Sequence, residues 1–362
     1  MLKYAVGILI IGILVFALLF FRKKGGGKQD NSQLRVFQDG TPKLCNGDEY
    51  STVKRSLSES RFLKDPEHVP YRSEIHLSTG AEVEESAKKT IDKLPKATDQ
   101  SPYSQTGVLI SEVMQILDQQ QLFQKGIHGE EAAMHLMEKK PSLMFLWYHE
   151  RLVANRYCID VQQSFQGYST FEFAARAIDS YGICPEFVYH SPNTNDEEEF
   201  NCKLTQTPPN WTYQHTDIHP NLQYNCIYRG EGKNIEDARI DCKYLLNKNI
   251  PVLCIVRCPD AASLIDRRKL DVPLHSIDDE EADCIAVYLY GYDEHQKVFH
   301  ARSPWGSEML NHGSFSISFG CWSQKTPMIR EAGYLSCSSW TVTQDIKHTK
   351  PKDIKDASFT FY

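Results

Sequence analysis

Cysteines and histidines are the residues of this chain that could supply a nucleophile, a base or a metal site. The eleven cysteines are scattered singly and their number is odd, which is not the pattern of a disulfide framework. Cys254 and Cys258 are separated by three residues, but no second Cys or His pair matches them, so we predict no metal site and no cofactor. The sequence also lacks a Gly-rich phosphate loop and a Gly-x-Ser-x-Gly elbow. In a reducing compartment most thiols would be small apolar core residues.

Secondary-structure elements must position any site, and in this chain the expected helices come mainly first and the expected strands after them. Apolar residues recur on one face from Thr106 to Leu122, which predicts a helix. The other expected helices cover Glu130–Lys139, Leu143–Val153, Thr170–Tyr181 with Gly182 as C-cap, and Ile235–Leu246 with Asn234 as N-cap. The expected strands are Val252–Arg257, Ile285–Tyr290, Lys297–Arg302, Ser314–Phe319 and Tyr334–Trp340. This order predicts an α+β fold with two lobes.

The N-terminal residues have a different character. Tyr4–Phe21 is an uncharged apolar stretch, and a helix of this length spans about 27 Å, close to the thickness of a bilayer core. We therefore expect a single-pass membrane anchor over residues 1–24. A cleaved signal peptide is the alternative, but its cations would precede a shorter apolar stretch, whereas Arg22, Lys23 and Lys24 follow this one. These cations favour a cytoplasmic position for the C-terminal side.

The rest of the chain divides by composition. Residues 25–94 are polar and resemble a linker or pro-segment, residues 95–345 are compact, and residues 346–362 form a tail. The formal net charge of −7 argues against a general nucleic-acid binder, which would have a basic surface.

Three separated stretches resemble the papain-like cysteine peptidase family, in the compact form of some bacterial and large-DNA-virus members. Phe145–Arg151 followed by Cys184-Pro185-Glu186 is similar to the family's FLYYNAR and YGVCPE runs, and Ile250–Leu253 is similar to its GYPVV strand. Tyr290–Asp293, Ser303–Gly306 and Gly313–Phe315 resemble HAVLLVGYD, NSWG and GY. The resemblance covers residues 95 to about 325. It implies a helical lobe and an antiparallel, barrel-like β lobe behind the N-terminal transmembrane helix.

The family's chemistry requires a Cys thiolate at a helix N-terminus, a His base, an Asn that orients the His, and a Gln that stabilises the oxyanion. The resemblance places the Gln at Gln100, but it places Thr106 at the Cys position, Ile285 at the His position and Ser303 at the Asn position. Cys284 is adjacent to Ile285, and His300 lies three residues before Ser303. Strand alternation, however, turns both side chains away from the predicted site. No catalytic residue is therefore predicted, only vestigial site positions.

Three functions stay open on these residues. The first is a membrane-anchored pseudopeptidase that binds a peptide or protein partner between its lobes, or serves as an assembly scaffold. The second is an active cysteine peptidase whose nucleophile is a residue such as Cys158 or Cys184. The third is a structural protein associated with a virion membrane or capsid, because the family members that this chain resembles include viral proteins.

Overall fold

A computed structural model describes fourteen stretches of the chain: 35–36, 42–43, 76–77, 87–98, 104–156, 170–190, 206–217, 221–230, 234–258, 268–271, 284–307, 310–324, 326–346 and 348–349. The predicted anchor Tyr4–Phe21 lies outside them. Among the helices that the structure describes, none combines the length and apolarity needed to cross a bilayer.

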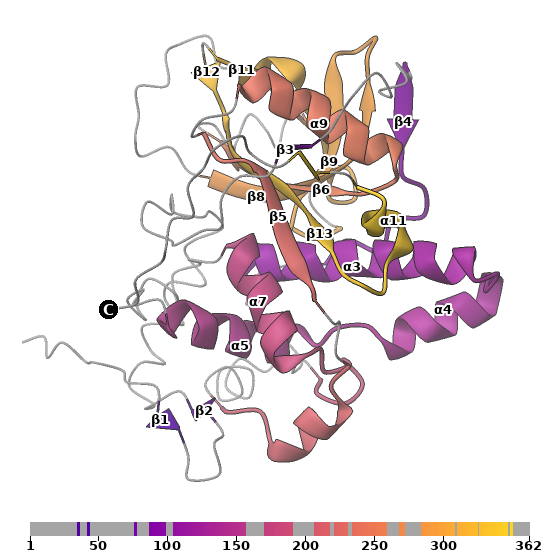
Figure 1. Cartoon of the computed structure of the whole chain (residues 1–362), viewed down its shortest axis with the longest axis vertical. Helices are drawn as coiled ribbons and strands as arrows, with labels where there is room; N and C mark the ends of the chain where they lie inside the picture. Colours follow the sequence, from indigo (N-terminus) through magenta and orange to yellow (C-terminus); the bar gives the residue numbers. More distant parts are fainter. Residues whose placement is uncertain are drawn as a thin grey trace, which may run out of the picture.

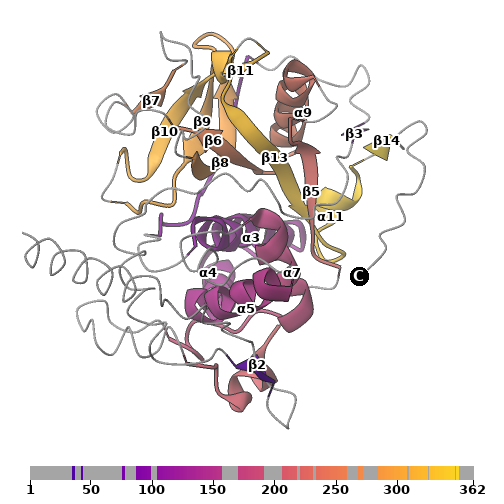
Figure 2. The ribbon, with the colours of Figure 1, turned by 90° about the vertical axis from the view of Figure 1, so that its left-hand side faces the viewer.

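Four helices form one side of the molecule and a sheet forms the other (Figures 1 and 2). The helices are α3 (Gln105–Gln124), α4 (Gly129–Glu138), α5 (Leu143–Arg156) and α7 (Phe171–Tyr181). A 3-10 helix, η1 (Asn210–His215), extends the helical side. In both views α3 lies between the sheet and α5, so its two faces meet different partners.

The main sheet has eight strands. Seven follow the order β5-β13-β6-β8-β9-β10-β7, and β4 also pairs with β8. All these pairs are antiparallel except β10 with β7. The strands are β4 (Lys88–Thr90), β5 (Gln223–Tyr228), β6 (Val252–Arg257), β7 (Lys269–Leu270), β8 (Cys284–Asp293), β9 (Val298–Arg302), β10 (Ser314–Ser318) and β13 (Ile329–Ser336).

The remaining elements are one helix beside the sheet and several short segments. Helix α9 (Ile235–Asn247) contacts the sheet, and η2 (Phe319–Cys321) and α11 (Thr341–Gln344) follow β10 and β13. The two-residue strands pair as β1 (Arg35–Val36) with β2 (Pro42–Lys43), β11 (Trp322–Ser323) with β12 (Thr326–Pro327), and β14 (His348–Thr349) with β3 (His76–Leu77).

Capping residues explain the helix boundaries. Ser104 accepts a hydrogen bond from the Gly107 N–H at 2.9 Å, and Thr170 accepts one from the Phe173 N–H at 3.1 Å. Asn234 caps α9 as expected, because its side chain accepts from the Glu236 N–H at 2.9 Å. Gly182 ends α7 with φ of 75°, a conformation that glycine adopts without strain.

The strand expected over Tyr334–Trp340 is misplaced. β13 runs from Ile329 to Ser336, and Trp340 is instead the N-cap residue of α11. The apolar pattern is interrupted by Glu331, a buried carboxyl whose Oε2 atom lies 3.5 Å from Nε of Arg229. A buried charge of this kind is recognised only when its partner is known.

The folded part begins before residue 95, earlier than composition suggested. β4 lies in the stretch assigned to a polar linker, yet it pairs with β8 through Thr90 and Gly291. Gly291 is required there, since an added Cβ would lie 2.4 Å from the carbonyl oxygen of Lys89. An edge strand with solvated side chains has no apolar pattern, so composition does not reveal it.

Candidate functional site

The first turn of α3 carries Thr106, the position where the resemblance implies a nucleophile. Thr106 is fully buried, and its Oγ1 donates a hydrogen bond to Oε1 of Glu150 at 3.0 Å. Ser104 Oγ donates to the other carboxyl oxygen, Oε2, at 2.5 Å. Glu150 belongs to α5, which lies on the side of α3 away from the sheet (Figure 2), so the carboxyl that accepts from Thr106 comes from the helical side.

Glu150 is the main functional-site residue that the sequence did not reveal. Its side chain is buried, and this burial raises the pKa of its carboxyl to about 7, although the bonds from Ser104 and Thr106 and the nearby Arg151 act in the opposite direction. Gly107 makes room for it, since a Cβ there would lie 2.9 Å from Oε2 of Glu150. The only sequence signal was a charge within the apolar stripe of the predicted helix.

The position where the resemblance implies a base is Ile285 on β8, and it is a fully buried hydrocarbon side chain. Next to it, the Ala286 N–H donates to Oε1 of Gln105 at 2.9 Å. This bond joins the first turn of α3 to β8, so the segments that carry Thr106 and Ile285 lie against each other as expected. An isoleucine cannot accept a proton, so the position offers no general base.

Ser303 follows directly after β9, whose last residue, Arg302, pairs with Tyr288 of β8. It is fully buried, its N–H donates to the Gly313 carbonyl at 2.8 Å, and its Oγ accepts from the Trp305 N–H at 3.4 Å. The hydroxyl thus stabilises its own loop. Gln100 lies outside the described residues, so its predicted role stays a prediction.

A second buried carboxyl, Glu112, joins the helical side to the sheet. Its Oε1 accepts from the Thr98 N–H at 2.8 Å and its Oε2 accepts from the Tyr288 hydroxyl at 3.1 Å. Burial raises the pKa of Glu112 to about 7, while the Thr98 bond and Arg302 act to lower it. Arg302 in turn donates to the Pro95 carbonyl at 3.3 Å. This network holds the segment before α3 against β8 and β9.

The described cysteines do not resemble activated nucleophiles. All eight are buried, and burial together with Glu186 raises the pKa of Cys184 to about 11. A thiol with such a pKa is protonated at neutral pH and unreactive. Cys158, the other candidate, lies outside the described residues. In the part of the chain that the structure describes, no three Cys, His, Asp or Glu residues gather as a metal site requires.

The histidines near the site also have structural partners. His300 is half-buried, and its ring stacks on Tyr290 with centroids 6.0 Å apart. Burial and Lys88 hold its pKa below the ordinary value. His149 is buried on α5, where its ring nitrogens lie 2.8 Å from the Phe145 carbonyl and 3.0 Å from the Tyr213 hydroxyl. These contacts give both imidazoles packing roles.

Comparison with known proteins gives one relative in sequence and several in structure. No family model matches the chain. An uncharacterized peptidase C1-like protein of Acanthamoeba polyphaga mimivirus is 25% identical over 182 residues, which are 49% of this chain and 53% of that protein. The chain thus spans about half the length of this curated relative.

Among solved structures, xylellain, a cysteine protease from Xylella fastidiosa, superposes with a TM-score of 0.53 at 16% identity, over 80% of this chain and 99% of that one. The bromelain protease from Ananas comosus gives a TM-score of 0.45 at 11% identity, over 69% and 99% of the two chains. The likeness to xylellain confirms the α+β fold expected from the sequence.

Proposed function

We propose that this chain, which has the papain-like fold and is similar in sequence to a viral peptidase C1-like protein, is a membrane-anchored pseudopeptidase. It binds a partner or holds an assembly together without cleaving peptide bonds. The observation that supports this most is the state of residue 106. Its hydroxyl donates a hydrogen bond to Glu150. Thr106, Ile285 and Ser303 are all fully buried, so none of them has exposed surface that could contact a substrate. Catalysis needs a nucleophile and a base that both reach the reacting atoms.

The absence of peptidase activity is the first expected result. Incubation of the chain with a mixed peptide library should give no cleavage, and a thiol-reactive peptide warhead should give no covalent adduct. The eight thiols that the structure describes are buried, and the pKa of Cys184 is raised, so none of these eight offers the warhead an accessible thiolate. Mass spectrometry of both reactions is the measurement. Cleavage that one cysteine substitution abolishes would contradict the proposal and identify the nucleophile.

The membrane anchor is tested separately. We expect the full chain to stay in the pellet after alkaline carbonate extraction, because the uncharged Tyr4–Phe21 stretch is long enough to span a bilayer core. A chain that begins near residue 30 should be released into the supernatant. Release of the full chain would exclude the anchor and leave the pseudopeptidase part of the proposal standing.

A further inference from the structure

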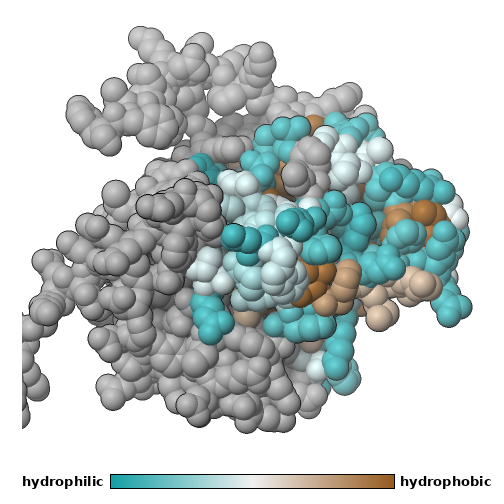
Figure 3. Space-filling model, turned by 90° about the horizontal axis from the view of Figure 1, so that it is seen from below, coloured by the Kyte–Doolittle hydropathy of each residue, from teal (hydrophilic) through white to brown (hydrophobic). Residues whose placement is uncertain are grey.

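Most of the exposed large apolar side chains among the described residues belong to the helical side of the molecule. Among the described residues, five large hydrophobic side chains are exposed: Met134, Met137, Phe187, Trp211 and Ile240. The first four belong to α4, to the turn after Cys184 and to η1, and only Ile240 belongs to α9 beside the sheet. Figure 3 shows brown and tan surface breaking the hydrophilic cover of the molecule seen from below. We call Met134, Met137, Phe187 and Trp211 the docking face.

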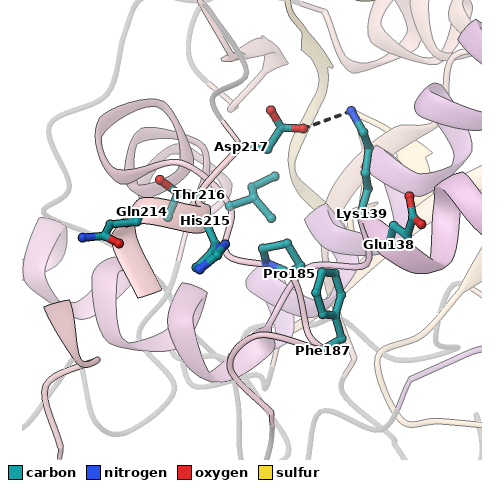
Figure 4. A pocket seen from close by; sticks show the side chains of 9 residues that line it. Glu138, Lys139, Pro185, Phe187, Gln214, His215, Thr216 and Asp217 are labelled. Atoms are coloured by element: carbon teal, nitrogen blue, oxygen red, sulfur yellow. Dashed lines mark hydrogen bonds and ion pairs between the residues drawn. The ribbon is translucent and has the colours of Figure 1, made fainter. Parts of the chain in front are cut away.

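One of these side chains, Phe187, lines a hollow of about 580 Å³. Its wall includes Lys139, Pro185, Phe187, His215 and Asp217, as Figure 4 shows. The other members of the docking face adjoin its wall: Glu138 and Lys139 of the wall directly follow Met137, and the ring of His215 lies 6.5 Å from that of Trp211. The volume is that of a site for a small ligand or a few side chains. Exposed methionine and aromatic side chains beside a hollow are typical of protein interfaces.

The charges around the docking face indicate the charge of the partner that it would attract. On a helix, side chains three and four residues apart are neighbours, so Met134 lies beside Glu130, Glu131 and Glu138. Lys139 and Lys140 follow, but the Lys139 ammonium is already 3.0 Å from Oδ2 of Asp217. The docking face is therefore acidic, because more carboxylates than ammonium groups border it. The carboxylates are those of Glu130, Glu131, Glu138 and Asp217, and the ammonium groups are those of Lys139 and Lys140.

The charge of this acidic apolar face disfavours two kinds of occupant. A second copy of the chain would bring like charges together, and the whole chain carries a formal net charge of −7. The anionic surface of a membrane would be repelled in the same way. We propose that the docking face binds a basic amphipathic segment of a partner protein, with apolar side chains in the hollow and Lys or Arg beside the glutamates of α4. This gives the proposed binding role a surface and a partner class.

Binding of a synthetic peptide tests this inference without reference to cleavage, so the two proposals can fail independently. The probe is a fluorescent helical peptide with leucines on one face and lysines on the other, titrated with the full chain in a zwitterionic detergent. Met137→Gln and Phe187→Ala should each weaken binding at least about tenfold, as expected for central apolar contacts. Glu130→Gln with Glu131→Gln should weaken binding at low salt and reduce its salt dependence.

Ile240→Gln is the matched control, because it also removes an exposed apolar side chain but lies outside the docking face. It should leave affinity unchanged, and a leucine–glutamate peptide should not bind. The proposal is overturned if the leucine–lysine peptide does not bind or if Ile240→Gln weakens binding as much as Met137→Gln. It is also overturned if sedimentation shows a dimer that Phe187→Ala dissociates, which would make a second copy the occupant.

Discussion

Glu150→Gln should make the chain increasingly more stable than the native protein as the pH rises from about 4.5 to 8. In the folded chain, burial raises the pKa of this carboxyl from 4.5 to about 7. Between these two values the folded state binds the proton and the unfolded state does not, so native stability falls as the pH rises. At about 1.4 kcal/mol per pKa unit, the loss approaches roughly 3 kcal/mol. A glutamine side chain does not titrate, so the variant does not undergo this loss of stability.

The measurement is the free energy of unfolding from urea titrations followed by tryptophan fluorescence at pH 5 and pH 8. Glu112→Gln should behave like Glu150→Gln, since burial raises the pKa of that carboxyl in the same way. Glu294→Gln supplies a control whose effect should be the same at pH 5 and pH 8. Its partners Lys243 and Lys297 hold its pKa below the ordinary value of 4.5, so the native carboxylate stabilises the fold at both pH values and this contribution is lost only at lower pH. A Glu150→Gln advantage that does not change with pH would show that Glu150 is ionised throughout.

The local elements of this fold could be predicted, and the buried charges could not. The periodicity of Leu109, Val113 and Ile116 identified α3 because a helix that buries one face repeats its apolar residues every three or four positions. Likewise, Val252–Arg257 was found as a strand with its bounds as observed. Both patterns depend only on neighbours in sequence.

The site depends on pairs that lie far apart in sequence. Ser104 and Glu150 are 46 residues apart, and Glu112 and Tyr288 are 176 residues apart. Nothing in the local pattern of α5 distinguishes Glu150 from a solvated glutamate, because its burial follows from the approach of α3 permitted by Gly107. The family resemblance predicts vestigial positions at Thr106, Ile285 and Ser303, but it does not predict the carboxyl that accepts a hydrogen bond from the first of them.

That carboxyl determines how the site would respond to restoration of the missing residues. Thr106→Cys alone should give no peptide cleavage and a slowly reacting thiol. The side chain at residue 106 contacts Glu150, and a nearby carboxylate raises a thiol pKa instead of lowering it from about 8.5. Ile285→His alone supplies a base with no nucleophile, and an imidazole in this fully buried position costs stability.

The smallest set that restores nucleophile, base and orienter is Thr106→Cys with Ile285→His and Ser303→Asn. At pH 7 its thiol should react with iodoacetamide at least about tenfold faster than that of Thr106→Cys, because an imidazolium lowers the thiol pKa by a unit or more. Adding Glu150→Gln should increase the rate again, since it removes the opposing charge next to residue 106. Thermal unfolding of each variant, with Ile285→Ala as a cavity control, separates loss of fold from loss of chemistry. If Thr106→Cys alone reacts as fast as the triple variant, then the thiol is activated without a histidine, and Thr106 does not occupy the position that the papain-like resemblance gives it.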